Sequence, residues 1–285
     1  YMLRVLGYLT GFFLLCGLAA VGSVIWIFWN YGQDLPDYAQ LEDYAPPVTT
    51  RVHAGDGSLL AEYAIQRRVF VPISIIPELV QNAFLAAEDD QFFQHNGIRV
   101  PSLVRAFYQM VKSGEIVSGG GTISMQVVRG YLLSREQKII RKIKEIYLAF
   151  ELESVATKEE ILSLYLNTIF LGNRSYGVEA AANQYFAKSI NELTLAESAL
   201  IASSAQLPSR INPIRSPDRS LVRRNWILGR MFKLGYIGKA QYLLAKDEPI
   251  VLSQLQTRFS LDGRYIAEIA RQALVLVLRL MQKPT

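Results

Sequence analysis

The first hydrophobic pattern in the chain is the run from Val5 to Trp29, which contains no charged residue. A membrane-spanning helix needs about 20 apolar residues, so this run is long enough to cross a bilayer and too long for the apolar part of a cleaved signal. Trp26, Trp29 and Tyr31 gather at its far end, as interfacial aromatic residues do. We therefore predict a cytoplasmic stub and one transmembrane helix in residues 1–33.

The charges that flank this run predict its orientation. Arg4 precedes the run, whereas Asp34 and Asp37 follow it. Basic residues favour the cytoplasmic side of a membrane, so we expect the N-terminus in the cytoplasm and the rest of the chain outside. Residues 34–48 are polar and contain several prolines, which is typical of a juxtamembrane linker.

Beyond the linker, apolar and polar residues alternate from Val48 to Val71 around a glycine-containing turn at residues 54–57. This alternation predicts a short β-hairpin at about Thr49–His53 and Leu59–Tyr63, with an ordered loop as the alternative.

After Pro77 the apolar residues recur at helical spacing, first in residues 78–89 and then from Pro101 to Val111. Further helices are indicated by capping-box patterns that begin at Ser134, Thr157 and Thr194. The pattern therefore predicts a mainly α domain after the hairpin.

Two more helices are expected near the end of the chain. One is basic and runs from about Arg219 to Leu234, before Gly235. The other is the apolar stretch Tyr265–Met281, which contains charged residues and is too short to span a membrane readily. We interpret it as a packed helix or the start of another domain.

Composition narrows the possible functions. The 285 residues carry 30 Lys and Arg against 25 Asp and Glu, a net charge of +5. This mild excess suits phosphate groups or an anionic membrane surface, and without a motif it does not indicate nucleic acid. The single cysteine, Cys16, excludes an intramolecular disulfide, and with His53 and His95 it cannot form a structural zinc site. A hard cation held by carboxylates remains open.

The acidic run Glu88-Asp89-Asp90 is a candidate for acid–base chemistry, because Phe92 and Phe93 follow it closely. Aromatic neighbours that exclude water change the protonation of a carboxylate, as general acids and bases require. The alternative is a solvated acidic cluster at a helix end.

A second carboxylate lies in the helix expected from about Gln137 to Glu153. Glu145 follows Arg141 at i and i+4, with Lys142 and Lys144 beside it. This is either an ion pair on a surface helix or a carboxylate that shares a cleft with Glu88, an arrangement suited to chemistry at a sugar anomeric centre. The expected core face of this helix consists of its apolar stripe: Ile139, Ile143, Ile146, Tyr147 and Phe150.

A glycine-rich stretch, residues 118–122, precedes Gln126 and Arg129. Consecutive glycines allow main-chain N–H groups to approach a ligand, and an arginine suits phosphate. The stretch lacks the Gly-Lys-Ser/Thr of a Walker loop, and a flexible surface loop is an equal alternative.

Five motifs occur in a fixed order. They are Glu88-Asp89-x-x-Phe92-x-x-His95-x-Gly97, Gly119-Gly120-x-Thr122-Ile123-x-x-Gln126, Arg141-Lys142-x-Lys144-Glu145, Tyr165-Leu166-Asn167-x-Ile169-Phe170-x-Gly172, and Gln206-x-Pro208-Ser209-x-x-Asn212-Pro213. Together they resemble the glycosyltransferase family 51 peptidoglycan polymerases, which include the transglycosylase domains of class A penicillin-binding proteins. The resemblance implies a mainly α, lysozyme-like domain at residues 49–248 with a small membrane-proximal jaw. Residues 249–285 would be an extension that leads into a further domain.

The resemblance also implies an activity: polymerisation of lipid II into glycan strands outside the bacterial inner membrane, with inversion and loss of undecaprenyl pyrophosphate. Glu88 would deprotonate the acceptor hydroxyl. Glu145 would orient the donor or help hold a divalent cation, Mg²⁺ or Mn²⁺. The positions that match substrate-binding residues are Asp89, Thr122, Gln126, Arg129, Arg141, Lys142 and Asn167. His95 and Gly97 would shape the turn after Glu88, and Asp90 would be solvated.

Several residues depart from the family pattern: Gly121, Met125, Gly130, Ser163, Ala187 and Ser203-Ser204-Ala205. The first two touch the donor site, but Glu88 and Glu145 are retained, so an active enzyme is expected. The chain contains no Ser-x-x-Lys. Its segment after Arg219 resembles the 1A-type class A proteins, so we expect a piece of a longer bifunctional protein.

The partners expected are lipid II, the growing glycan strand, membrane lipid and other cell-wall synthesis proteins, with moenomycin as an inhibitor. Two alternative functions remain open. One is a glycan-cleaving lysozyme-like enzyme, and the other is a catalytically impaired, membrane-anchored scaffold.

Overall fold

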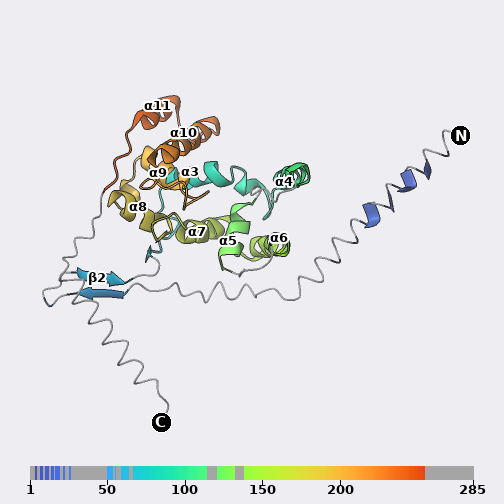
Figure 1. The fold of residues 1–285 in the computed structure, drawn as a ribbon, viewed down its shortest axis with the longest axis horizontal. Helices are drawn as coiled ribbons and strands as arrows, with labels where there is room; N and C mark the ends of the chain where they lie inside the picture. The colour runs from blue at the N-terminus through green and yellow to red at the C-terminus, as the bar shows by residue number, and fades with distance from the viewer. Residues whose placement is uncertain are drawn as a thin grey trace, which may run out of the picture. The chain divides into compact units, whose positions relative to one another are not determined.

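The computed structural model describes residues 69–113, 121–131 and 138–253, the strand residues 50–53, 59–63 and 67–68, and scattered positions before residue 56. These residues are mainly helical, as predicted (Figure 1). They fall into two compact units. The first unit comprises Tyr1–Tyr44 and Gln91–Leu162, and the second comprises Ala45–Asp90 and Ser163–Thr285.

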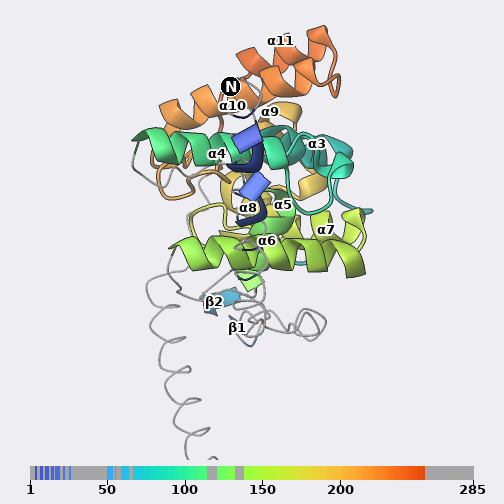
Figure 2. The ribbon, with the colours of Figure 1, turned by 90° about the vertical axis from the view of Figure 1, so that its right-hand side faces the viewer.

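The first unit is built around two helices that pack against each other, α5 (Ile123–Tyr131) and α6 (Lys138–Val155) (Figure 2). It also contains the 3-10 turn η1 (Phe92–Gln94), helix α4 (Val100–Ser113) and the first turn of α7 (Lys158–Thr168). The buried apolar side chains of α5 and α6 are Ile123, Met125, Val127, Val128, Leu148, Ala149 and Leu152.

The predicted core face of α6 is wrong at two of its positions, Tyr147 and Phe150. Tyr147 and Phe150 are exposed, while Glu145, Leu148 and Leu152 are buried. The inward face therefore follows an i, i+3, i+7 spacing that begins at a charged residue. A hydrophobic template does not count a carboxylate as a core position, so it selects the wrong stripe.

The second unit is organised around α9 (Leu195–Ser203), in which every residue from Ser198 to Ser203 is buried. Helices α3 (Glu78–Glu88) and α10 (Pro217–Lys233) both pack against α9 and against each other (Figure 1). Two further helices, α8 (Val178–Phe186) and α11 (Lys239–Asp247), also contact α9. The ends of α3 and α10 lie close to the predicted ones, and α9 starts at its predicted capping box.

The predicted β-hairpin is confirmed. β1 (Thr50–His53) pairs antiparallel with β2 (Leu59–Tyr63), with Thr50 opposite Tyr63. A second, unpredicted pairing is parallel and joins β3 (Arg67–Arg68) to β4 (Ser175–Tyr176).

Local side-chain bonds fix several helix ends. Thr194 and Glu197 form the predicted capping box at the start of α9, and Thr157 and Glu160 form another at the start of α7. The box predicted at Ser134 lies outside the described residues. Ser189 and Glu192 form an unpredicted box at the 3-10 turn η2 (Ile190–Glu192).

The buried Arg224 joins α10 to the end of α11. Its guanidinium donates to the main-chain carbonyls of Lys246 and Glu248, at 2.8 and 2.7 Å. These carbonyls belong to the negative end of α11, where a cation is favourable.

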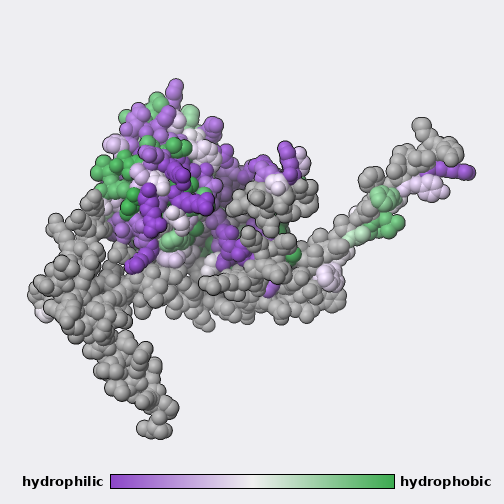
Figure 3. All heavy atoms as spheres, in the orientation of Figure 1, coloured by the Kyte–Doolittle hydropathy of each residue, from purple (hydrophilic) through white to green (hydrophobic). Residues whose placement is uncertain are grey.

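Much of the N-terminal region and most of the tail lie outside the described residues. The described positions between Arg4 and Trp26 are helical, and their large apolar side chains are exposed (Figure 3). Within the part of the chain that the structure describes, no helix has the length and apolar character needed to span a bilayer. The predicted linker and the predicted helix Tyr265–Met281 also lie outside the described residues.

Candidate active site

The acidic run lies at the C-terminal end of α3, in the second unit. Glu88 is the last residue of the helix, as expected from the sequence. The chain then leaves the helical conformation at Asp89, whose N–H still donates to the carbonyl of Leu85 at 3.0 Å. Asp89 is buried and Glu88 is half-buried. The supporting role of Asp89 stays a prediction.

Helix α10 places two arginines beside the acidic run. Arg230 forms an ion pair with Asp90, so the prediction that Asp90 is only solvated is wrong. Arg223 donates to the carbonyl of Ala87 at 3.4 Å and interacts electrostatically with Glu88. Burial lowers the pKa of Arg223, and the charge of Glu88 acts in the opposite direction.

Sequence reasoning missed both arginines. Trp226 lies between them in the chain, at i, i+3, i+7 spacing, and its ring centroid is 4.0 Å from Cζ of Arg223 and 5.8 Å from Cζ of Arg230. A basic–aromatic–basic stripe on a helix face was the available signal, and it points to cation–π packing.

Glu145 is the centre of a cationic cluster in the first unit. Its side chain is 3% exposed, yet three cations surround it: Lys142 Nζ at 3.2 Å, Arg141 Nε at 3.6 Å and Arg129 Nε at 3.9 Å. The three basic side chains are each 35–48% exposed. The buried carboxylate thus holds three basic groups whose outer surfaces remain accessible to a ligand, and the cluster keeps a net positive charge.

The predicted substrate residue Thr122 has a structural role in this geometry. Its hydroxyl donates to the carbonyl of Gly97 and accepts from the N–H of Met125, at the start of α5. The side chain is buried. These bonds occupy the hydroxyl within the protein, and the predicted contact between Thr122 and substrate stays a prediction.

Gly97 shapes the turn after the acidic run, as expected. Its φ is +78°, and a Cβ at this position would lie 2.7 Å from the carbonyl oxygen of Ala149 in α6. His95 also has a structural contact, because its carbonyl accepts from Lys158 Nζ at 2.6 Å. Lys158 in turn pairs with Glu153 at 2.6 Å.

Asn167 is likewise used inside the protein. Its amide oxygen accepts from the N–H of Val71 at 2.7 Å, and its amide nitrogen donates to the carbonyls of Val71 and Ser163 at 2.9 and 2.8 Å. Both amide hydrogens are thereby directed at main-chain acceptors. The geometry supports a structural role, and substrate binding by Asn167 stays a prediction.

The departures from the family pattern fit their surroundings. Met125 is buried, so an apolar side chain suits the position. A Cβ at Gly121 would lie 3.7 Å from Lys142 Nζ, an ordinary contact distance, so a serine there would fit beside the cationic cluster. Ala187 ends α8 with φ +53°, a left-handed conformation that favours glycine.

The structure thus brings Arg129, Arg141, Lys142 and Glu145 together, with the half-buried Gln126 on the same helix as Arg129. Glu88 and Asp89 belong to the second unit. The pairing of Glu88 with Glu145 across one cleft stays a prediction.

A divalent cation does not fit the described surroundings of Glu145. Hard cations take several oxygen ligands, but the charged neighbours of Glu145 are three cations, which would repel a metal ion. Among the described residues no group of three potential metal ligands occurs. The expected dependence on Mg²⁺ or Mn²⁺ stays a prediction.

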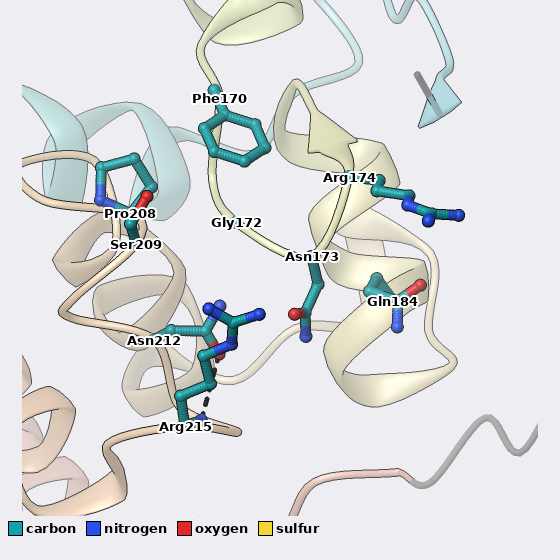
Figure 4. A pocket seen from close by; sticks show the side chains of 9 residues that line it. All are labelled: Phe170, Gly172, Asn173, Arg174, Gln184, Pro208, Ser209, Asn212 and Arg215. Carbon is teal, nitrogen blue, oxygen red and sulfur yellow. Dashed lines mark hydrogen bonds between the residues drawn. The ribbon is translucent and has the colours of Figure 1, made fainter. Parts of the chain in front are cut away.

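A separate pocket of about 460 Å³ lies in the second unit (Figure 4). The loop that contains Phe170 and Asn173, helix α8 and the loop that contains Ser209 and Arg215 line it. Asn173 and Arg215 point toward the space between the loops, whereas Arg174 extends away from it (Figure 4). None of the predicted site residues lines this pocket.

The chain is similar to known proteins over most of its length. The family model described as transglycosylase matches residues 56–232. The chain is 43% identical over 264 residues to penicillin-binding protein 1A of Rickettsia felis, covering 92% of this chain and 33% of the relative. It is 44% identical over 262 residues to penicillin-binding protein 1A of Pseudomonas aeruginosa, covering 92% of this chain and 32% of the relative.

A solved structure is also similar. The crystal structure of penicillin-binding protein 1A from Haemophilus influenzae matches with a TM-score of 0.52 and 34% sequence identity, covering 81% of this chain and 25% of that chain. The chain spans about a third of the length of the curated relatives described here.

Proposed function

This chain belongs to the transglycosylase family, and we propose that it is a peptidoglycan glycosyltransferase. In this proposal it polymerises lipid II, the lipid-linked disaccharide precursor of peptidoglycan, into glycan strands. The similarity to penicillin-binding protein 1A in several bacteria supports this assignment.

The cationic cluster at Glu145 is the observation that carries the proposal. A pyrophosphate leaving group needs positive charge beside it as its bond to the sugar breaks. Arg129, Arg141 and Lys142 supply that charge from accessible side chains, and the buried Glu145 fixes their positions. An arginine presents a planar fork that matches phosphate oxygens, so two of the three groups suit this ligand well.

Glu88 is the proposed general base. It accepts the proton of the acceptor 4-hydroxyl while that oxygen attacks the anomeric carbon of the donor. The carbon–oxygen bond to pyrophosphate breaks, its electron pair leaves with the undecaprenyl pyrophosphate, and the single displacement inverts the anomeric centre. The charged neighbour Arg223 supports an ionised carboxylate that is ready to accept a proton.

We also propose attachment to the outer face of the bacterial inner membrane. The uncharged run in residues 5–29 supports an anchor with a cytoplasmic N-terminus. Helix α4 exposes Val100, Val104 and Tyr108, at i, i+4, i+8 spacing, by 60–65%. This apolar face supports a membrane-proximal jaw, which would place the site near its lipid-linked substrate. The lysozyme-like character of the domain stays a prediction.

The pocket beside Phe170 supports a saccharide ligand within the same function. Asn173, Gln184 and Arg215 are planar polar side chains, which offer the hydrogen-bond donors and acceptors that sugar hydroxyl groups need.

The test is polymerisation of lipid II by the full chain in detergent or vesicles. Glu88→Gln should abolish turnover, and Glu145→Gln should weaken it, because neither amide can replace the charge. Glu159→Gln, an exposed position on α7, is the matched control and should leave turnover unchanged. Retained turnover in the Glu88 variant would overturn the assignment of the base.

The two alternative functions give different results in the same experiment. A glycan-cleaving enzyme would release fragments from finished peptidoglycan without using lipid II. A scaffold with an intact fold would bind neither a lipid II analogue nor moenomycin.

A further inference from the structure

The acidic run ends a helix in an electrostatically unfavourable place. Glu88, Asp89 and Asp90 are consecutive at the C-terminal end of α3, and the last turn of that helix contains no basic residue. The C-terminal end of a helix carries partial negative charge, which disfavours carboxylates there. Adjacent carboxylates also repel one another. The compensating charge must therefore come from another element.

Helix α10 supplies this charge in two separate contacts. Arg230 pairs with Asp90, whereas Arg223 reaches the carbonyl of Ala87 and the charge of Glu88. Each arginine thus serves a different carboxylate. Helix α10 packs against α3, so both contacts are made between elements that are already in place.

Arg223 is held at this position by packing. Its Cζ lies 4.0 Å from the centroid of the Trp226 ring, within the range of a cation–π interaction. Its buried Nε has no hydrogen-bond partner among the described residues. A buried donor without a partner is destabilising, so hydrogen bonding by this atom does not explain the presence of Arg223 here. A guanidinium remains protonated throughout the neutral range, which makes it a permanent charge.

We propose that Arg223 is a positioning residue for Glu88. Stacked on Trp226 and bonded to the end of α3, it keeps the proposed general base ionised and fixed in direction before proton transfer. This inference rests on the proposed glycosyltransferase function. Arg223 acts through Glu88 and is not itself assigned a contact with substrate.

Other charged groups also lie around the acidic run in the part of the chain that the structure describes. Asp89 and Asp90 adjoin Glu88 in the chain and oppose its ionisation, and Tyr236, after α10, interacts with Asp90. Helix α9, which also packs on α3, carries Glu197 at its start, and that carboxylate is paired with Lys188. The remaining charge of α3 is Glu78, at its opposite end.

The experiment measures lipid II turnover as a function of pH for the full chain and three variants. Arg223→Met keeps an unbranched apolar stem that can pack on Trp226 and removes the charge, and Arg223→Lys keeps the charge. Arg219→Met removes an exposed charge one turn earlier on α10 and serves as the control.

We expect Arg223→Met to move the acidic limb of the pH–rate profile upward by about one unit, so that turnover falls about tenfold below the limb and recovers above it. The KM for lipid II should stay within about twofold of wild type, because Arg223 is assigned no contact with the substrate. Arg223→Lys should restore most of the shift, and Arg219→Met should show none. An equal loss of turnover at every pH would overturn the inference and assign Arg223 a structural role.

Two measurements keep the inference separate from folding and from the proposed function. If Arg223→Met does not fold, as judged by circular dichroism, Trp226→Leu leaves the charge but removes its platform and should shift the limb in the same direction. If wild-type protein does not polymerise lipid II, the proposed function fails. An NMR titration of carboxyl-labelled Glu88, assigned with Glu88→Gln, then decides the effect of Arg223: an unchanged midpoint in Arg223→Met overturns it.

Discussion

Asn167 binds the main chain of Val71 at two points, through an accepted bond of 2.7 Å and a donated bond of 2.9 Å. The side-chain amide thereby pairs with both main-chain polar groups of Val71, as a neighbouring strand would do. Both Val71 and Asn167 are buried, so water cannot replace these bonds.

We expect Asn167→Ala to lower the free energy of unfolding by about 1–3 kcal/mol, because the N–H and carbonyl of Val71 lose their partner. Chemical denaturation followed by circular dichroism measures this change. Asn183→Ala is the matched control: Asn183 is exposed and bonds to Glu179 on its own helix, so its loss should stay within about 0.5 kcal/mol. Equal effects at the two positions would contradict a special role for the Val71 contact.

Gly97 should accept no side chain. Alanine there would place Cβ 2.7 Å from a main-chain oxygen of α6, at a φ of +78°. We expect Gly97→Ala to lower the free energy of unfolding by about 2–4 kcal/mol, from overpacking and backbone strain together. Gly130→Ala, in α5 and with nothing within 4 Å, should be neutral or stabilising by up to about 1 kcal/mol. Thermal unfolding of both variants tests the contrast.

Ala187→Gly should stabilise the protein by about 0.5–1 kcal/mol. Ala187 is exposed and left-handed at the end of α8, so glycine relieves strain without loss of packing, although it also gains freedom in the unfolded chain. The reciprocal change is Gly235→Ala, after α10, where φ is +78° and no atom lies within 4 Å. Gly235→Ala should lower the free energy of unfolding by a similar amount. Midpoints of urea unfolding that move in the same direction would disprove the conformational explanation.

Removal of one cation from the cluster at Glu145 should weaken donor binding. We expect Arg129→Met to raise the KM for lipid II about tenfold, equivalent to about 1.4 kcal/mol of one charged contact with phosphate. Because Arg129 is half exposed, the effect should be larger at low salt than at high salt. Lys233→Met, an exposed change on α10, should leave the KM unchanged. Initial rates over a range of lipid II concentrations measure both.

The parts of the fold that were predictable are those with local signals. The hairpin had a glycine turn, the capping boxes at Thr157 and Thr194 had their partners three residues away, and α10 ended before a glycine. Helix α8 was missed because its N-cap is Gly177, which has no side chain and so gives no capping signal in the sequence. The pairing of β3 with β4 was also missed, since strands of two residues leave no pattern.

In the candidate site, too, the contacts within one helix were predictable and the contacts between distant helices were not. Arg141 and Lys142 lie within one helical turn of Glu145, so spacing alone indicated that contact. Arg223 and Arg230 reach the acidic run across 136 and 140 residues of sequence. The packing of α10 against α3 creates these contacts, and the local stripe of Arg223, Trp226 and Arg230 indicates only their cation–π packing.

Tyr185 makes the stability of the second unit depend on pH in the alkaline range. Its buried hydroxyl donates to the carbonyl of Leu171 at 2.6 Å and accepts from Asn212 at 3.2 Å. Burial strongly raises the pKa of Tyr185 in the folded protein, whereas an unfolded tyrosine ionises near pH 10. The folded and unfolded states bind the same proton below that pH, so stability is intact there.

Above about pH 10 the unfolded state loses this proton and the folded state does not, so the free energy of unfolding should fall by about 1.4 kcal/mol for each further unit. Tyr185→Phe should be less stable at neutral pH but should lose this dependence on alkali. Ultraviolet titration at increasing urea would record Tyr185 ionising together with unfolding. The ultraviolet absorbance of its phenol thus reports when the loops that carry Leu171 and Asn212 separate.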